Sequence, residues 1–398
     1  MAKTGIYNML SMSRKSKFIL LASLFNSLFL SFLVYIQSNL PVFTGENLEY
    51  FSWIELLKSK IRGIEGNDSI QPLYVNVAFD KQLVDEIDEF GDTIGNNVIT
   101  DRRKLLDFMR ILRTSGNYRY IILDIRFEKG VNTELDSALF AEISSMDRIV
   151  VAKHRDMEDR APLLLPKLAL ADYTTTILST NFVRYEYVHD GMPSMPLYAF
   201  RELTGKDIIK RGLFYTCGGK LCYKSLFIHF TTDEDFEREL NEDNIYKWEN
   251  LGHDILNNKE YTSEKINGKC VVIGDFINDV HDTYVGKRPG PTINFYAFRA
   301  LLNGEHFVSI PITLFFVLLY FLISIALFGD GLLEKLPVIR KSHSKILHFI
   351  LHLMEYTVVL SSITIFLYLF YDVTVSILLP SLYFSIQKTI IQYKKYTL

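Results

Sequence analysis

The side chains best suited to chemistry are carboxylates that follow expected strands or begin expected helices in the middle of the chain. Parallel α/β sheets bind ligands at the carboxyl ends of their strands, and carboxylates gathered there could hold a divalent cation or a cationic ligand. The candidate ligand-binding residues are Asp80, Arg103, Asp124, Asp136, Asp275 and Asp282. Asp279 belongs to the same acidic group. The plainer interpretation, which we favour, is that these acids cap helices, pair with neighbouring arginines or face water.

A second polar group interrupts an apolar segment near the end of the chain. His348, His352 and Glu355 are four and three residues apart, so they share one face of a helix. Ionisable groups at membrane depth can relay protons or bind a metal. These three residues fall in the first turns of the segment, where side chains reach the membrane interface. We therefore favour a role at that interface or in helix packing.

Two of the three cysteines flank a short turn. Cys217 and Cys222 lie on either side of Gly218 and Gly219, in a stretch that predicts a β-hairpin. A disulfide between them is the interpretation we favour, and two free thiols are the alternative. The pair lacks the matching cysteines or histidines that a zinc site needs, so we expect no metal and no cofactor. Cys270 begins an expected core strand and is interpreted as a buried small hydrophobe.

Four apolar segments predict transmembrane helices. Residues 18–36 run for 19 residues without a charge, after a basic leader at 1–17. This length spans a bilayer, and an uncleaved anchor is favoured over a signal peptide because the segment ends without the small residues of a cleavage site. The other segments are 307–328, 346–371 and 373–391. The last of them carries a proline and two polar residues, which makes it the weakest of the four.

The distribution of basic residues predicts the orientation. Eleven lysines and arginines fall in the leader, in the loop 329–345, and at the end of the last segment and in the tail 392–398. Basic flanks stay in the cytoplasm, so both termini should be cytoplasmic and residues 37–306 should lie outside. The outer segment has 32 basic and 42 acidic residues, a net charge of −10. We therefore expect the lipid bilayer as a partner of the spans, and no nucleic acid.

Residues 37–306 predict an α/β domain with a parallel-sheet core. Strands and helices alternate, and the strands are continuous runs of Ile, Leu and Val that suit burial on both faces. The expected strands are 73–79, 120–127, 147–153 and 270–275, and the expected helices are 101–112, 133–144 and 293–303. A β-rich insertion is expected between them, over 181–230. The fold class is thus an α/β extracytoplasmic domain plus four transmembrane helices.

Several of these segments resemble the type 2 CHASE domain, an extracytoplasmic sensory domain of bacterial receptors. The similarity covers most of residues 45–305. It rests on VNVAFDKQLV at 75–84, ITDRRKLLDFM at 99–109, the stretch from YIILDIRFEKG to ELDSALFAEI at 120–143, and the closing stretch at 268–307. One anchor, this domain and three further spans is also the usual membrane layout of that family. The resemblance implies an α/β sensory domain in a bacterial cytoplasmic (inner) membrane.

The expected function is that of a receptor. We expect a membrane-anchored sensory protein that detects an extracytoplasmic ligand or a state of the envelope. Because no cyclase or kinase module follows the last span, the signal should pass through the spans to a separate signalling or membrane partner, and the chain could form homo-oligomers. The alternative is a structural or assembly component that uses its outer domain for docking. Catalytic motifs are absent from the sequence, so we expect no enzyme, and an enzyme acting outside the cytoplasm is the least favoured reading.

Overall fold

The computed structural model divides the chain into two units. Met1–Leu40 and Val308–Leu398 form one, called here the helical unit, and Pro41–Phe307 form the other, called the α/β unit. The structure describes residues 14–40, 70–87, 90–127, 133–155, 162–172, 184–189, 191–230, 248–284, 286–329, 345–371 and 376–397.

A six-stranded parallel sheet forms the centre of the α/β unit. Its order is β14-β1-β15-β4-β5-β6, and all five neighbouring pairs run parallel. The strands are β1 (Pro72–Asn76), β4 (Tyr120–Asp124), β5 (Ile149–Lys153), β6 (Leu168–Leu170), β14 (Trp248–Asn250) and β15 (Cys270–Gly274). The predicted parallel α/β core is therefore confirmed, since the Val, Ile and Leu runs form its buried central strands.

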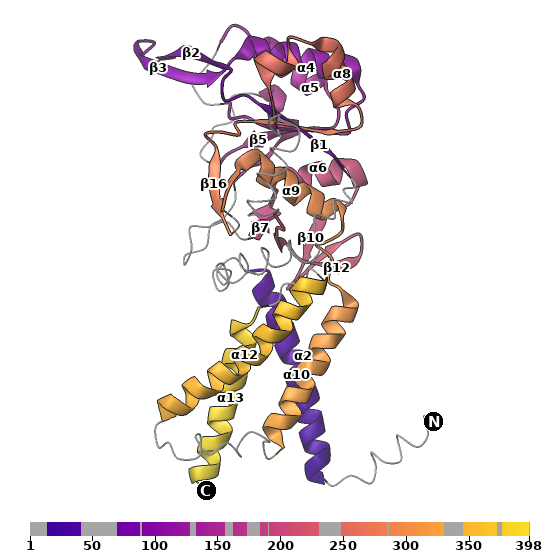
Figure 1. Cartoon of the computed structure of the whole chain (residues 1–398), viewed down its shortest axis with the longest axis vertical. Helices are drawn as coiled ribbons and strands as arrows, with labels where there is room; N and C mark the ends of the chain where they lie inside the picture. The colour runs from indigo at the N-terminus through magenta and orange to yellow at the C-terminus, as the bar shows by residue number, and fades with distance from the viewer. Residues whose placement is uncertain are drawn as a thin grey trace, which may run out of the picture. The chain divides into compact units, whose positions relative to one another are not determined.

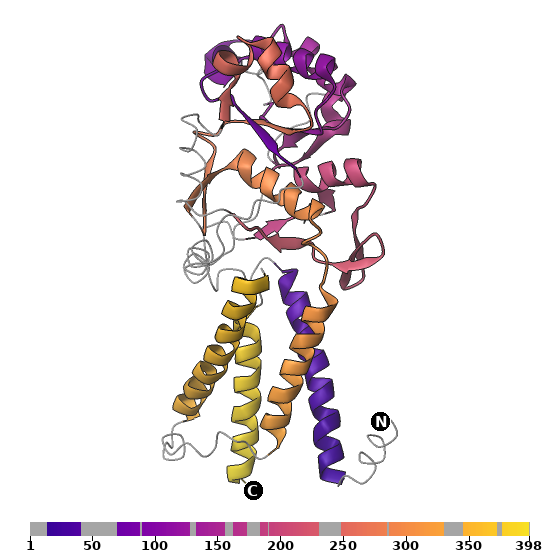
Figure 2. The ribbon, with the colours of Figure 1, turned by 45° about the vertical axis from the view of Figure 1, so that its right-hand side comes forward.

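Helices cover both faces of this sheet (Figures 1 and 2). The helices on one face are α4 (Arg102–Ser115), α5 (Asp136–Ser145) and α8 (Lys259–Ile266), and those on the other are α6 (Met195–Thr204) and α9 (Gly290–Leu302). Buried Leu, Ile and Val side chains fill the first interface. Aromatic side chains contribute to the second, where the ring centroids of Phe298 and Tyr120 lie 5.8 Å apart. The unit thus has three layers, with the sheet in the middle.

Local sequence signals set the limits of α4. The Asp101 carboxylate accepts hydrogen bonds from the backbone N–H groups of Arg103 and Lys104, each at 3.0 Å, so Asp101 caps the helix. Gly116 ends the helix with a φ of 63°, a left-handed conformation that glycine adopts without strain. The predicted helix 101–112 is thus confirmed, with Asp101 as its cap and Arg102 as its first residue.

A buried ion pair joins α4 to α5. Arg102 Nε lies 3.1 Å from Asp136 Oδ1, and the two side chains are only 1% and 8% exposed. The guanidinium also lies over the ring of Phe127, 4.7 Å from its centroid. The second carboxylate oxygen of Asp136 accepts the backbone N–H of Thr133 at 2.7 Å. Asp136 therefore stabilises the contact between the two helices.

Small antiparallel sheets accompany the central sheet, and most fall in the predicted β-rich insertion. The three-stranded sheet is β10 (Ile208–Arg211), β11 (Phe214–Cys217) and β12 (Lys220–Cys222). The two-stranded sheets are β7 (Arg184–Glu186) with β13 (Ser225–Phe227), β8 (Val188–His189) with β9 (Met192–Pro193), β16 (Val280–Thr283) with β17 (Gly286–Pro289), and β2 (Lys81–Ile87) with β3 (Thr93–Thr100). The turn of Gly218 and Gly219 is confirmed, and both have positive φ angles. The β2–β3 hairpin is not among the strands predicted from the sequence.

The two cysteines of the predicted disulfide are buried and do not form that disulfide in the structure. The strand register is the reason, because Cys217 lies opposite Lys220 and Cys222 lies opposite Tyr215. Diagonal neighbours on adjacent strands are about 7–8 Å apart, whereas a disulfide needs Cβ atoms about 3.5–4.5 Å apart. This register favours the alternative of two thiols. Burial raises the pKa of Cys222 to about 12, which keeps the thiol protonated at neutral pH.

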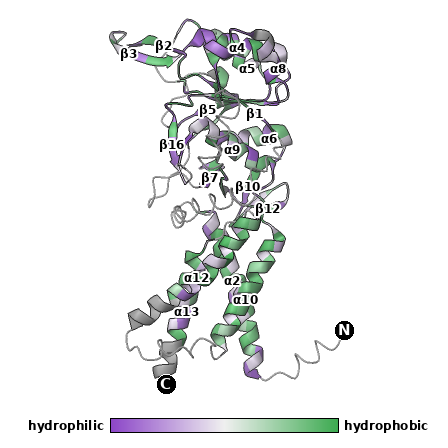
Figure 3. Ribbon diagram, in the orientation of Figure 1, coloured by the Kyte–Doolittle hydropathy of each residue, from purple (hydrophilic) through white to green (hydrophobic). Residues whose placement is uncertain are grey.

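Three helices of the helical unit are long and apolar enough to cross a membrane, among the residues that the structure describes (Figure 3). They are α2 (Arg14–Ser38), α10 (Ile310–Phe328) and the stretch Leu353–Phe370 of α12 (Lys345–Tyr371). These three helices correspond to the first three predicted segments and indicate a multi-pass membrane protein. The fourth predicted segment contributes α13 (Leu378–Thr397), which is not one of the three.

Polar side chains join the helices of this unit. The amide nitrogen of Asn26 on α2 donates hydrogen bonds to Ser324 of α10 at 2.9 Å and to Gln387 of α13 at 3.1 Å. Lys388 of α13 pairs with Glu355 of α12 at 3.1 Å. Glu355 thus has a partner on a neighbouring helix. The side chains of His348 and His352, predicted to share its helix face, lie outside the described part of the chain.

The Arg102–Asp136 pair yields a stability prediction. Asp136→Asn should lower the free energy of unfolding by about 3–5 kcal/mol, because it leaves a buried guanidinium without its counter-charge. Adding Arg102→Met should recover part of that loss. Urea unfolding of the full chain in detergent, followed by tryptophan fluorescence, measures the effect, since both tryptophans, Trp53 and Trp248, belong to the α/β unit.

The control is the exposed pair of Asp107 and Arg110 on the same helix, whose side chains are 52% and 54% exposed. Asp107→Asn should change the free energy of unfolding by no more than about 1 kcal/mol. Equal losses for Asp136→Asn and Asp107→Asn would contradict the assignment of Asp136 as a buried structural partner.

Candidate functional site

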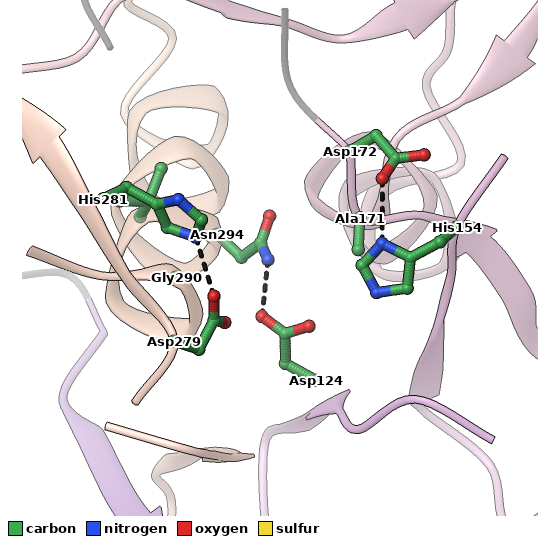
Figure 4. A pocket seen from close by; sticks show the side chains of 9 residues that line it. Asp124, His154, Ala171, Asp172, Asp279, His281, Gly290 and Asn294 are labelled. Carbon is green, nitrogen blue, oxygen red and sulfur yellow. Dashed lines mark hydrogen bonds and ion pairs between the residues drawn. The ribbon is translucent and has the colours of Figure 1, made fainter. Parts of the chain in front are cut away.

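A polar cavity of about 340 Å³ lies at the carboxyl edge of the parallel sheet (Figure 4). It is lined by Asp124, His154, Ala171, Asp172, Asp279, His281, Gly290, Ile293 and Asn294. This size is at the small end of the range for ligand pockets in proteins. Its position is the one where parallel α/β sheets bind their ligands.

Three neighbouring strands deliver one wall of the cavity. Asp124 is the last residue of β4, His154 directly follows β5, and Asp172 lies two residues beyond the end of β6. Each strand is buried over most of its length, so charged side chains emerge only at or just beyond its carboxyl end. Because β4, β5 and β6 are adjacent and parallel, these three side chains reach the same edge.

The opposite wall comes from the β16–β17 hairpin and the start of α9. Asp279 directly precedes β16, His281 lies within it, and Asn294 lies in the first turns of α9. Gly290 begins that helix, and its N–H donates a hydrogen bond to the carbonyl of Asp279 at 2.8 Å. A Cβ atom at Gly290 would come within 2.3 Å of the Asp279 carboxylate, so only glycine allows this approach. The positive end of the α9 dipole therefore faces an acidic residue of the protein itself.

Two histidine–aspartate pairs stand on the two sides of the cavity. His154 Nδ1 lies 2.8 Å from Asp172 Oδ1, and His281 Nε2 lies 2.7 Å from Asp279 Oδ1. A carboxylate accepts the ring N–H of its histidine, which orients the ring. Figure 4 shows Asp124 between the two pairs. The backbone N–H of Arg155 also donates to Asp172 at 2.8 Å and holds that carboxylate in place.

Asp124 is the most perturbed acid of the site. Burial and, secondarily, the nearby Asp279 carboxylate raise the pKa of Asp124 to about 7. The amide of Asn294 donates a hydrogen bond to Asp124 Oδ2 at 2.8 Å, which opposes this shift. The buried hydroxyl of Tyr185 donates in turn to Asn294 Oδ1 at 2.7 Å, so it fixes the orientation of the amide. A carboxyl group with such a pKa can exchange a proton near neutral pH.

The charge of the lining limits what the cavity can bind. The described residues that line the cavity include three carboxyl groups, two imidazoles and neither lysine nor arginine, so the charge of the lining is neutral or negative even with both imidazoles protonated. An anionic ligand would thus find no net positive charge, whereas an amine or another cationic group would find carboxylates on every side. Among the described residues, no group of three His, Cys, Asp or Glu side chains is arranged to hold a metal ion.

One of the six sequence-predicted ligand-binding residues, Asp124, lines this cavity. Asp80 is buried, pairs with Lys104 at 2.6 Å and accepts the N–H of Gly252 at 3.0 Å. Asp275 accepts the backbone N–H of Asn278 at 2.8 Å in the turn after β15 and pairs with Lys81 at 3.0 Å. Burial alone would raise the pKa of Asp275, but the hydrogen bonds from Asn278 and Lys81 outweigh it and lower the pKa.

The other three predicted residues also lie away from the cavity. Asp136 pairs with Arg102, as described above. Arg103 is exposed on the first turn of α4, and Asp282 is exposed on β16 opposite Lys287. The structure therefore does not gather the six candidates into one site. It supports the plainer interpretation for Asp80, Asp136 and Asp275, which have structural partners.

Four residues of the cavity with polar side chains are not among the candidates predicted from the sequence. They are His154, Asp172, His281 and Asn294. A usable signal existed for His154, since it follows a predicted core strand directly, as Asp124 does. Asp172 follows a strand too short to be recognised, and Asn294 sits on a helix that approaches from another part of the chain. Their convergence depends on the order of strands in the sheet.

Comparison of the chain with protein-family models, with curated proteins and with solved structures gave no match. The resemblance to the type 2 CHASE domain therefore stays a prediction from the residues that carry it.

The raised pKa of Asp124 yields a prediction about stability and pH. The folded state keeps a proton on Asp124 up to about pH 7, whereas the unfolded chain loses it near pH 4, so this residue lowers stability as the pH rises through that window. Asp124→Asn should reduce the loss of stability between pH 5 and pH 8 by roughly 1–3 kcal/mol. Urea unfolding at the two pH values measures it, with Asp107→Asn as the control. An unchanged pH dependence in the Asp124→Asn variant would contradict the assignment.

Proposed function

We propose that this protein is a membrane-anchored receptor whose α/β unit lies outside the cytoplasm and binds a small ligand with a cationic group. The cavity at the carboxyl edge of the sheet is the observation that supports this proposal most directly. Three carboxyl groups and two imidazoles converge there from four separate segments of the chain, and the described residues of the lining include no basic side chain other than histidine. The resemblance to the type 2 CHASE domain supports the sensory assignment.

The distribution of charge supports the orientation. The basic residues that flank the apolar segments would lie in the cytoplasm, and the α/β unit, with its excess of acids, would lie on the other side of a bacterial inner membrane. This arrangement requires that α13 is a fourth span. Gln387 and Lys388 would otherwise weigh against it, but each has a partner on another helix of the same unit. A paired polar side chain costs less inside a membrane than an unpaired one.

Helix α9 offers a route from the ligand to the membrane. Gly290 and Asn294, at its start, line the cavity, and the chain continues from its end at Leu302 to the first residue of α10, Ile310. A ligand that pulls on Asn294 or changes the charge of Asp124 would bias the position of α9, and α10 follows it in sequence. A separate signalling or membrane protein would then receive the change, since a ligand acts by favouring one of two conformations.

The second candidate function is a docking component of an envelope assembly. The exposed apolar side chains of the β2–β3 hairpin favour it, because exposed apolar patches mark interaction sites. A receptor that assembles through this hairpin would combine both roles. The acidic cavity has no part in the docking alternative, so ligand binding distinguishes the two functions.

Ligand binding can be tested with a panel of small amines. Methylammonium, ethanolamine, putrescine and arginine would be added to the full chain in detergent, and thermal unfolding followed by tryptophan fluorescence. At one hundred times its dissociation constant, a bound amine stabilises the folded chain by about 2.7 kcal/mol. We expect at least one amine to stabilise the wild type, and the double variant Asp172→Asn, Asp279→Asn to weaken its binding by about tenfold or more, because hydrogen bonds to charged groups are worth about 1.5–3 kcal/mol.

Asp107→Asn, outside the cavity, is the matched control and should bind as the wild type does. Acetate and inorganic phosphate at the same concentrations should leave the unfolding temperature unchanged. Stabilisation by these anions and by none of the amines would overturn the proposed ligand class.

The orientation can be tested by labelling introduced cysteines in intact cells. The three native cysteines are buried, so a membrane-impermeant maleimide should react mainly with an introduced thiol. Lys210→Cys, on the exposed strand β10, should be labelled in cells whose outer envelope is opened but whose inner membrane is intact. Lys3→Cys and Lys395→Cys should react only after the inner membrane is permeabilised. Labelling of Lys395→Cys with the membrane intact would exclude four spans with both termini inside.

A further inference from the structure

The β2–β3 hairpin leaves large apolar side chains in solvent. Leu83 and Val98 lie directly opposite one another on the two strands and are 71% and 65% exposed. Ile94 and Phe90, nearer the turn, are 63% and 82% exposed. Figure 1 shows the hairpin extending away from the helices and the central sheet of the α/β unit. An isolated two-stranded hairpin is only marginally stable in water, so this surface calls for a partner.

The two strands differ in how well their outer edges are protected. Within the described residues β2 and β3 form a sheet of their own, so each has an edge that pairs with no other strand. Natural proteins protect such edges with charged residues or proline. Strand β2 carries Lys81, Asp85 and Glu86, whereas β3, with the sequence TIGNNVIT, carries neither a charge nor a proline. The pairing of β3 with β2 is regular from Gly95 to Thr100, beyond a bulge near the turn.

The charge of the unit indicates which partner fits this edge. Residues 37–306 carry a net charge of −10, so two copies repel one another wherever their acidic surfaces meet. Strand β3 is a neutral strip on that surface and meets no such repulsion from an identical strip. Two antiparallel β3 strands are related by a two-fold axis, the commonest symmetry of homodimers.

We propose that β3 is an interface between two copies of this chain, which pair antiparallel along its outer edge. The two hairpins then form a four-stranded sheet in the order β2-β3-β3-β2, with the charged β2 strands on the outside. Val98 of each copy approaches Val98 of the other, so apolar surface that is exposed in one copy becomes covered. The backbone N–H and C=O groups along the edge of β3 gain hydrogen-bond partners. The combined sheet has four strands, whereas about three are needed for a sheet to be stable on its own.

Cysteine crosslinking of the full chain in lipid nanodiscs or detergent tests this contact. Val98→Cys places an exposed thiol directly opposite its own copy across the two-fold axis, so it should form covalent dimers on mild oxidation. Asn96→Cys faces Thr100 of the other copy in this register, so it should form far fewer dimers. Lys210→Cys, exposed on another antiparallel sheet, is the matched control and should stay monomeric. Dimers formed equally by all three variants, or by none, would overturn the proposal.

A charge on the neutral strand tests the energetics. Val98→Lys should raise the dissociation constant of the dimer by at least about tenfold, because it brings two like charges together across the interface. Ile209→Lys, which replaces an apolar side chain that is 51% exposed on β10, should leave it unchanged. Light scattering over a dilution series measures both, and thermal unfolding verifies that both variants are folded. A wild type that stays monomeric at every concentration would overturn the proposal. So would a monomeric wild type whose hairpin binds a different protein.

Discussion

The α/β unit depends on one constraint, which is that its central sheet is covered by helices on both faces. Side chains from the middle of β1, β4, β5 and β15 must therefore be apolar, and the strands have no face left for polar function. Polar groups can appear only where a strand stops. The cavity is the result, because Asp124, His154 and Asp172 lie at or just beyond the carboxyl ends of three adjacent strands. The site and the core are two consequences of the same layering.

Acidic residues in this unit serve two distinct purposes. Asp80 and Asp136 are buried against Lys104 and Arg102, where breaking a pair would leave a charge without compensation. Asp124 accepts a hydrogen bond from an amide and lies near the Asp279 carboxylate, and burial together with that carboxylate raises its pKa. A carboxylate that already pairs with a cation of the protein gains little from a cationic ligand. A buried carboxylate without such a pair gains more, because the cation stabilises its charged form.

Sequence alone predicts the layers well and the site only partly. Apolar runs such as YIILD and CVVIG identify buried strands, and the helical spacing of residues 101–112 identifies α4, because these signals are local. The order of strands is not local: β15 lies between β1 and β4, although it follows them by more than a hundred residues. Without the strand order, the sequence does not show that Asp124 lies near His154 and Asp172 and away from Asp80. The β2–β3 hairpin escapes prediction because it lacks the apolar alternation of a half-buried strand.

The position of β1 in the sheet has a consequence for how the protein is made. β1 pairs with β14 and β15, and the first of these strands begins more than 170 residues later in the chain. At the usual pace of synthesis, β1 waits roughly 10–35 s before either neighbour exists. Throughout that interval an apolar strand has two open edges, so it is a target for chaperones and for aggregation. The sheet can close only shortly before α10 is synthesised, which couples completion of this unit to the insertion of the helices that follow it.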